Sequence, residues 1–202
     1  MRYAQIRSLD VSNGEGCGVA LFVQGCPFNP HCKNCFNPET WDFNGGKEWT
    51  EETKNKFLKL IDRPYIKRVS LLGGEPLAEQ NLDDVLSLIK EIRISFPEKT
   101  IWLYTGYKLF INYLESHKQH KYVLSTKPNA LTSFIYDNDL FKKMQKEDKK
   151  RSEIISLCDV VIDGRYIDEQ RNLSKKWAGS DNQRVIDIRQ SLAQGKAVLY
   201  CE

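Results

Sequence analysis

Three cysteines within ten residues constrain this chain more than any other feature. Cys26, Cys32 and Cys35 belong to the run Cys-Pro-Phe-Asn-Pro-His-Cys-Lys-Asn-Cys, whereas the other three cysteines are scattered along the sequence. Clustered cysteines in a reducing compartment bind metal more often than they form disulfides. The fold is therefore expected to bring these three thiolates together around a metal centre.

The composition predicts one globular domain spanning residues 1–202. Hydrophobic residues make up 41% of the 202 residues and charged residues 28%, which is ordinary for such a domain. A net charge of +3 does not indicate nucleic-acid binding. No apolar run approaches the roughly 20 residues that span a bilayer, and the first five residues lack the apolar core of a signal peptide. We therefore expect a cytoplasmic protein without a nucleic-acid or membrane partner.

Strand-like and helix-like patterns alternate along the chain. Apolar runs predict strands at residues 18–24, 69–72, 101–104 and 160–162, and apolar periodicity predicts helices at 51–61, 82–92 and 108–117. This alternation favours an α/β fold, with a parallel sheet and crossover helices. The strands are too few for a closed eight-stranded barrel. The charged run at 142–151 is expected to form a solvated helix face.

The cysteine loop has two chemical interpretations. In the first, His31 or Cys17 joins the three cysteines around zinc, since Cys-x2-Cys is a common zinc half-site. In the second, the three thiolates bind a [4Fe–4S] cluster. Clusters that only transfer electrons usually have four cysteine ligands. A three-cysteine cluster would leave one iron without a protein ligand, and that iron can bind a small molecule.

A glycine motif, Gly73-Gly74-Glu75-Pro76, follows the second predicted strand. Glycines lack a Cβ atom and so let a ligand approach the main chain closely. In α/β sheets, ligands bind at the carboxyl ends of strands, and both this motif and the cysteine loop occupy such ends. Zinc binding gives no reason for the glycine motif, so its presence favours the cluster. Glu75 could equally be a helix-start carboxylate without a ligand role.

Several motifs together resemble one family within the radical S-adenosylmethionine (radical SAM) enzymes. They occur in family order and span nearly the whole chain. That family comprises the activating proteins of the anaerobic (class III) ribonucleoside-triphosphate reductases. The matching segments are residues 14–16, 21–26, 35–43, 72–77, 104–107, 161–166 and 179–187.

The resemblance implies a fold and a set of site residues. The expected fold is an incomplete parallel β/α barrel of the radical SAM type. A [4Fe–4S] cluster would be held by Cys26, Cys32 and Cys35, with no catalytic residue beyond the cluster and the cofactor. S-adenosylmethionine would be contacted by Asn34, Phe36, Gly73, Gly74, Glu75 and Thr105.

The resemblance also implies a reaction and partners. The reduced cluster would cleave S-adenosylmethionine, and the resulting 5′-deoxyadenosyl radical would take a hydrogen atom from a glycine of the reductase large chain. A low-potential electron donor such as flavodoxin is implied, and a homodimer is allowed. Residues 163–166 and 182–184 would help to accept the partner's glycine loop.

The sequence departs from the family in two places. The family spaces its cysteines as C-x3-C-x2-C, whereas five residues separate Cys26 from Cys32 here, which predicts a two-residue bulge that a loop can absorb. A helical segment near residues 129–156 is expected to be an insertion. Three other functions remain open: an activase of another glycyl-radical enzyme of the formate-lyase type, a radical SAM enzyme acting on a small molecule, and a zinc-stabilised binding module.

Overall fold

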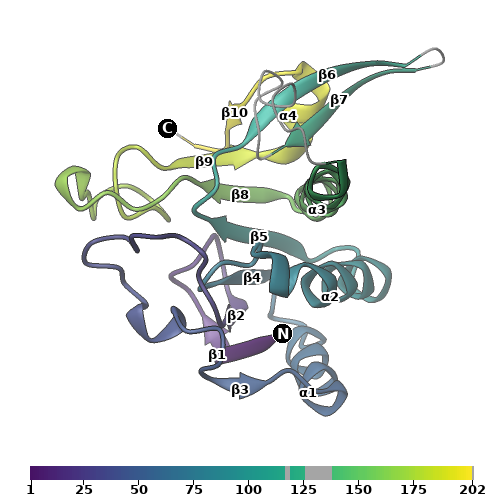
Figure 1. Cartoon of the computed structure of the whole chain (residues 1–202). Coiled ribbons are helices and arrows are strands. Elements are labelled where there is room, and N and C mark those ends of the chain that lie inside the picture. Colours follow the sequence, from purple (N-terminus) through teal and green to yellow (C-terminus); the bar gives the residue numbers. More distant parts are fainter. Residues whose placement is uncertain (117–118, 126–137, 202) are drawn as a thin grey trace.

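One open, mixed sheet of eight strands runs through the molecule (Figure 1). The computed structural model describes residues 1–116, 119–125 and 138–201, with side chains described for 1–110 and 146–201. In sheet order the strands are β10 (Val198–Leu199), β9 (Arg184–Asp187), β8 (Val160–Asp163), β5 (Thr100–Thr105), β4 (Arg68–Gly73), β2 (Gly18–Val23), β1 (Arg2–Asp10) and β3 (Lys47–Glu48). Strands β2, β4, β5 and β8 are parallel, and the strands outside them pair antiparallel.

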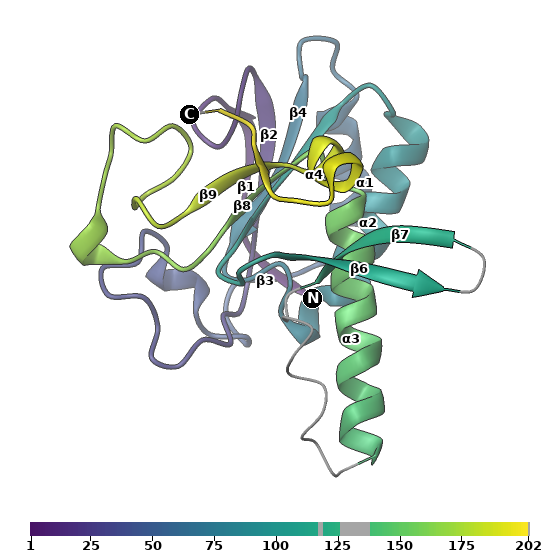
Figure 2. The same cartoon turned by 90° about the horizontal axis from the view of Figure 1, so that it is seen from above.

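The longer helices cover one face of this sheet. Helices α1 (Glu51–Ile61), α2 (Leu82–Ser95) and α3 (Asn138–Ser156) lie together on one side, and the loops after β2 and β8 lie on the other (Figures 1 and 2). The short helix α4 (Ile188–Gln194) contacts α3. Single helical turns occur at Pro38–Thr40, Glu79–Asn81 and Asp168–Gln170. The helix-free face therefore remains available for a site.

Alternating side chains divide the central strands between two apolar layers, as a pleated strand requires. In β5, Ile101 and Leu103 join the main core under the helices, whereas Trp102 and Tyr104 belong to smaller clusters on the opposite face. Burial of both faces explains why the central strands read as continuous apolar runs in the sequence.

The predicted elements of the α/β core are confirmed, but one predicted helix is wrong. Residues 108–117 were expected to form a helix, and instead β6 (Phe110–Ser116) pairs antiparallel with β7 (Gln119–Ser125) in a separate hairpin. The segment is rich in aromatic and β-branched residues, which suit a strand. A short apolar run fits a helical period by chance, so periodicity alone does not distinguish the two. Strands β1, β3, β9 and β10 were not predicted.

Helix α3 covers the later part of the expected insertion, and residues 126–137 lie outside the described structure. The charged run on this helix is not wholly solvated. Arg151 is buried, and its Nε donates to the Leu77 carbonyl at 2.9 Å. The expectation of a solvated face is thus wrong for Arg151, because its guanidinium finds a main-chain acceptor next to the sheet.

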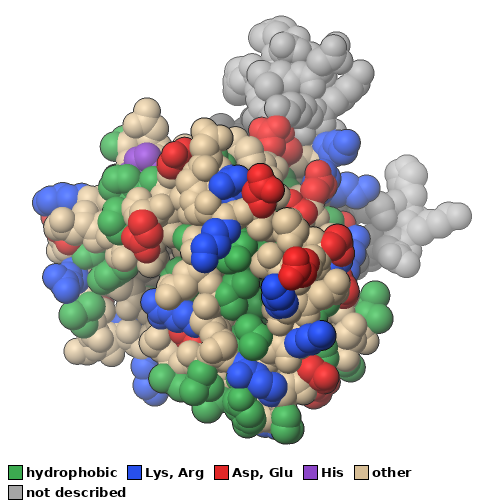
Figure 3. Space-filling model, turned by 90° about the horizontal axis from the view of Figure 1, so that it is seen from below, with side chains coloured by type: hydrophobic (Ala, Val, Ile, Leu, Met, Phe, Trp, Pro, Cys, Tyr) green, Lys and Arg blue, Asp and Glu red, His purple; other side chains and the backbone are tan. Residues whose placement is uncertain are grey.

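The surface carries both signs of charge. Figure 3 shows basic and acidic side chains interspersed over one face, which agrees with the small net charge of +3. Within the described residues, no helix is long and apolar enough to cross a membrane.

Candidate functional site

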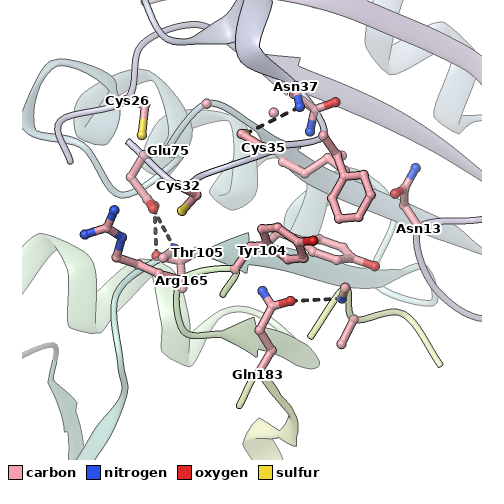
Figure 4. Close-up of a pocket in the computed structure, with 18 of the residues that line it drawn as sticks. Asn13, Cys26, Cys32, Cys35, Asn37, Glu75, Tyr104, Thr105, Arg165 and Gln183 are labelled. Atoms are coloured by element: carbon pink, nitrogen blue, oxygen red, sulfur yellow. Dashed lines mark hydrogen bonds between the residues drawn. The ribbon is translucent and has the colours of Figure 1, made fainter. Parts of the chain in front are cut away.

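A cavity of about 590 Å³ opens on the helix-free face, where β2, β4 and β5 end (Figure 4). Its wall includes all three clustered cysteines, the glycine motif after β4 and the residues that end β5. The site residues expected from the sequence that line the cavity are Cys26, Cys32, Cys35, Phe36, Gly73, Gly74, Glu75 and Thr105. The fold therefore brings together motifs that lie far apart in the sequence.

Main-chain hydrogen bonds fix the start of the cysteine loop. The Gly25 amide donates to the Thr40 carbonyl at 2.8 Å, and the Cys26 amide donates to the Trp41 carbonyl at 3.0 Å. Gly25 has a φ of +95°, and a Cβ there would lie 2.0 Å from the Phe43 ring. Only glycine meets both requirements, so the turn that delivers Cys26 into the cavity depends on Gly25.

The glycine motif lies directly against this loop. The Gly74 amide donates to the Val23 carbonyl at 2.9 Å, and the Glu75 amide donates to the Gly25 carbonyl at 2.8 Å. A Cβ on Gly74 would lie 2.4 Å from the Gly25 carbonyl oxygen. Gly74 therefore allows close contact between two loops of the chain itself, in addition to leaving space at the cavity wall.

Glu75 joins the end of β4 to the end of β5. Its Oε1 accepts hydrogen bonds from the Leu77 amide at 2.9 Å and the Thr105 hydroxyl at 2.8 Å, and its Oε2 accepts from the Gly106 amide at 2.8 Å. The side chain is buried, and burial raises its pKa to about 7 although these three donors favour the ionised form. Glu75 and Thr105 thus hold the cavity wall together.

The three thiols share an environment that the other cysteines do not. Burial raises the pKa of Cys26 to about 11, and the nearby Glu75, Cys32 and Cys35 charges act in the same direction. The Asn37 amide lies 3.5 Å from the Cys35 sulfur, close enough for a weak N–H···S hydrogen bond. The cysteines that do not line the cavity are Cys17, Cys158 and Cys201.

The two chemical interpretations of the cysteine loop make different demands on the positions of the thiols. Among the described residues, no three or more His, Cys, Asp or Glu side chains converge on a point where one ion could bind. A tetrahedral zinc site requires such convergence. A cubane cluster places each thiolate on a different iron, so its ligands surround a larger volume. His31, a candidate zinc ligand, stacks on Trp41 with ring centroids 4.3 Å apart.

Asn34 and Phe36 differ in their relation to the cavity. Phe36 lines it and packs against the Tyr166 ring, with centroids 5.0 Å apart. Asn34 is not among the lining residues; it has a φ of 54°, and its side-chain amide donates to Asp168 at 2.9 Å. The structure gives Asn34 a role in holding the loop, and its contact with a cofactor stays a prediction.

The late segment, residues 164–183, uses most of its polar side chains within the chain. The side-chain amide of Asn182 donates to the Arg165 carbonyl at 2.8 Å, and the side-chain amide of Gln183 donates to the Gly164 carbonyl at 2.9 Å. Arg184, which follows the segment, pairs with Asp163. Of these side chains, Gln183 lines the cavity, and the role of this segment in accepting a partner's glycine loop stays a prediction.

Sequence reasoning missed one wall of the cavity, which includes Ser12 and Asn13. The loop that carries them is held by Arg68, which is fully buried and pairs with the equally buried Asp10 at 3.0 Å. Arg68 also donates to the Asn13 carbonyl at 2.6 Å. One signal in the sequence could have indicated this wall: Arg68 stands at the start of a buried strand. A buried cation requires partners nearby, and the loop with Asn13 supplies them.

Tyr104 also lines this part of the cavity, and its buried hydroxyl has no hydrogen-bond partner among the described residues. Such unpaired buried groups are uncommon in proteins.

Three thiols at one cavity agree with an iron–sulfur protein that has a single cluster, the class that comparison with known families indicates. A family model described as a 4Fe-4S single cluster domain matches residues 12–126 and 119–186. The similar proteins include anaerobic ribonucleoside-triphosphate reductase-activating proteins from Enterobacteria phage T4, Vibrio cholerae and Escherichia coli K12. In that order, they are 34%, 31% and 30% identical to this chain. The matches cover 92%, 92% and 94% of this chain, and 93%, 97% and 100% of the relatives' own lengths. The chain belongs to this family of reductase-activating proteins.

Proposed function

We propose that this chain activates an anaerobic ribonucleoside-triphosphate reductase by radical SAM chemistry. The observation that carries the proposal is the meeting of three thiols and the glycine motif in one cavity, in a chain whose relatives bear the name of that activity. The large chain of the reductase is the proposed substrate. A low-potential donor such as flavodoxin would supply the electron, and the active form would be a monomer or a homodimer in the cytoplasm.

The open sheet supports the finer fold assignment. Its four parallel strands, with helices on one face and the cavity on the other, suit an incomplete β/α barrel of the radical SAM type. A barrel that does not close leaves a side through which an extended segment of a large partner can reach the cavity. The whole chain, residues 1–202, would form this single domain, with an insertion near 129–156.

The proposed site divides its work between two sides of the cavity. Cys26, Cys32 and Cys35 would hold a [4Fe–4S] cluster, and Gly73, Gly74, Glu75, Thr105, Phe36 and Asn34 would form the S-adenosylmethionine site. When bound, this pair supplies an organic radical by reductive cleavage of the cofactor. The chain's own residues would orient the cofactor, and apolar lining residues such as Phe22, Leu72 and Trp177 would exclude water.

Electron paramagnetic resonance tests the proposal directly. Reconstituted protein, a reductant, S-adenosylmethionine and the reductase encoded beside this gene are mixed without oxygen. A glycyl-radical doublet that requires both proteins is expected. If 5′-deoxyadenosine forms while the doublet appears only on a formate-lyase-type enzyme, the chemistry stands and the partner is wrong. Zinc in place of iron and sulfide in anaerobically purified protein would reject the whole proposal.

A further inference from the structure

The five residues between Cys26 and Cys32, here called the gap segment (residues 27–31), are anchored at both ends of their length. At one end the Phe28 ring packs on the Tyr107 ring, with centroids 5.1 Å apart. At the other end the His31 ring stacks on Trp41. The gap segment is therefore a packed part of the cavity wall. A loop could instead have absorbed its two additional residues as a bulge without contacts.

One arginine contacts the gap segment twice. The Arg165 guanidinium lies over the Phe28 ring, 5.2 Å from its centroid, and donates a hydrogen bond to the Pro30 carbonyl. Figure 4 draws Arg165 on the side of the cavity that carries Cys26 and Cys32. A planar guanidinium can stack on a ring and donate to a carbonyl at once, which a lysine ammonium does less well.

The residues opposite Arg165 leave space for Phe28. Gly106 follows β5, and a Cβ there would lie 2.4 Å from the Phe28 ring. The Gly106 amide is itself bound to the Glu75 carboxylate at 2.8 Å. Phe28 thus inserts between the end of β5 and Arg165, and it reaches the strand end that also carries the cofactor-side residues.

The main chain of Arg165 is held in turn by two side chains of the late segment. Asn182 binds the Arg165 carbonyl and Gln183 binds the Gly164 carbonyl, while the Gly164 amide donates to the Tyr107 carbonyl at 3.0 Å. These bonds fix the main chain from which the Arg165 side chain extends. The fold therefore places Arg165 beside the gap segment.

We propose that Arg165 is a positioning residue for the cluster: it holds Phe28 and Pro30 so that the longer first gap still presents Cys26 and Cys32 at cluster spacing. Asn182 and Gln183 support it by fixing its main chain. This inference rests on the proposed cluster but adds a role for residues outside the cysteine and glycine motifs. It also gives the two additional residues of the gap a structural purpose.

The first test uses the protein without a cluster. Lys33 follows Cys32 and is exposed, so tryptic cleavage after Lys33 reports the order of the cysteine loop. Arg165→Ala is expected to speed that cleavage about tenfold, since it removes a charge-assisted hydrogen bond and a ring contact. Arg165→Lys should recover part of the protection. Arg171→Ala, an exposed arginine of the same segment, is the matched control and should leave the rate unchanged.

The second test measures cluster binding itself. Iron per chain after anaerobic reconstitution, and the half-time of iron loss to a chelator, are compared for wild type, Phe28→Ala, Arg165→Ala and the double variant. Both single variants should lose iron several-fold faster than wild type. The double variant should lose iron more slowly than the two single effects multiplied together predict, because the contact between Phe28 and Arg165 is lost only once.

The outcomes separate this inference from the function on which it rests. If wild type takes up no cluster, the proposed function fails. If wild type binds the cluster but Arg165→Ala matches it in both cleavage after Lys33 and iron loss, Arg165 does not position the loop. Strictly additive effects in the double variant would also overturn the inference, since they would mean that Phe28 and Arg165 act independently.

Discussion

At the scale of single residues, Glu75 shows how one carboxylate can join two strand ends at the wall of a site. Both of its oxygens are used by donors from the ends of β4 and β5. The sequence predicted its position at a strand end but left open whether it had a ligand role. Hydrogen bonds between residues thirty positions apart cannot be deduced from a local motif, so this role needed the three-dimensional structure.

The raised pKa of Glu75 predicts a pH dependence of stability. A carboxyl whose folded pKa exceeds its ordinary value binds more protons in the folded state, so stability is highest at low pH and falls as the pH rises from about 4.5 through about 7. The full effect is at most on the order of 3 kcal/mol. Glu75→Gln removes this titration.

Denaturant unfolding of cluster-free protein at pH 5 and pH 8 measures the effect. The free energy of unfolding of wild type, relative to Glu75→Gln, should be larger at pH 5 than at pH 8. Glu48→Gln, which changes an exposed carboxylate in the same way, is the control variant. An equal difference for Glu75→Gln would mean that burial does not perturb this carboxyl.

At the scale of elements, the parallel strands and helices α1 and α2 were predictable, whereas the outer strands and the late segment were not. Strands β2, β4, β5 and β8 are buried on both faces and read as apolar runs, and helices α1 and α2 carry clear helical periodicity. Strand β1 is half-buried with an irregular pattern, so its alternation is weak. The late segment has no regular periodicity at all, and its shape comes from side chains binding main chain.

The contact between the loops after β2 and β4 makes a prediction for Gly74→Ala. The new Cβ would meet the Gly25 carbonyl, so one of the two loops must move. We expect a loss of stability of about 1–3 kcal/mol, and weaker iron uptake together with weaker S-adenosylmethionine binding. From the sequence alone, this glycine was expected only to let a ligand approach the main chain.

Gly16→Ala provides the control for this variant. Gly16 has a positive φ, of +71°, and a Cβ there would meet nothing within 4 Å. Its change should cost roughly 1 kcal/mol through backbone strain and leave iron uptake intact. Normal iron content in Gly74→Ala, measured after reconstitution, would show that the two loops do not depend on each other.

At the scale of the whole molecule, the fold sorts the six cysteines into two groups. Three line the cavity and three do not. Alanine variants of Cys26, Cys32 and Cys35 should lose the cluster, seen as loss of iron and of the reduced-cluster resonance signal. Variants of Cys17, Cys158 and Cys201 should keep both. A Cys17→Ala protein as empty of iron as Cys26→Ala would reveal a fourth protein ligand and remove the open iron.

The walls of the cavity come from almost the full length of the chain, from Arg7 to Gln183. This has a consequence for biosynthesis. A nascent chain that has left the ribosome only as far as β5 already exposes all three thiols, but it lacks β8 and the late segment that holds the cysteine loop. The three thiols thus leave the ribosome before the segment that fixes their positions. We therefore expect productive iron delivery to follow the emergence of the late segment from the ribosome, when its residues have closed around the cysteine loop.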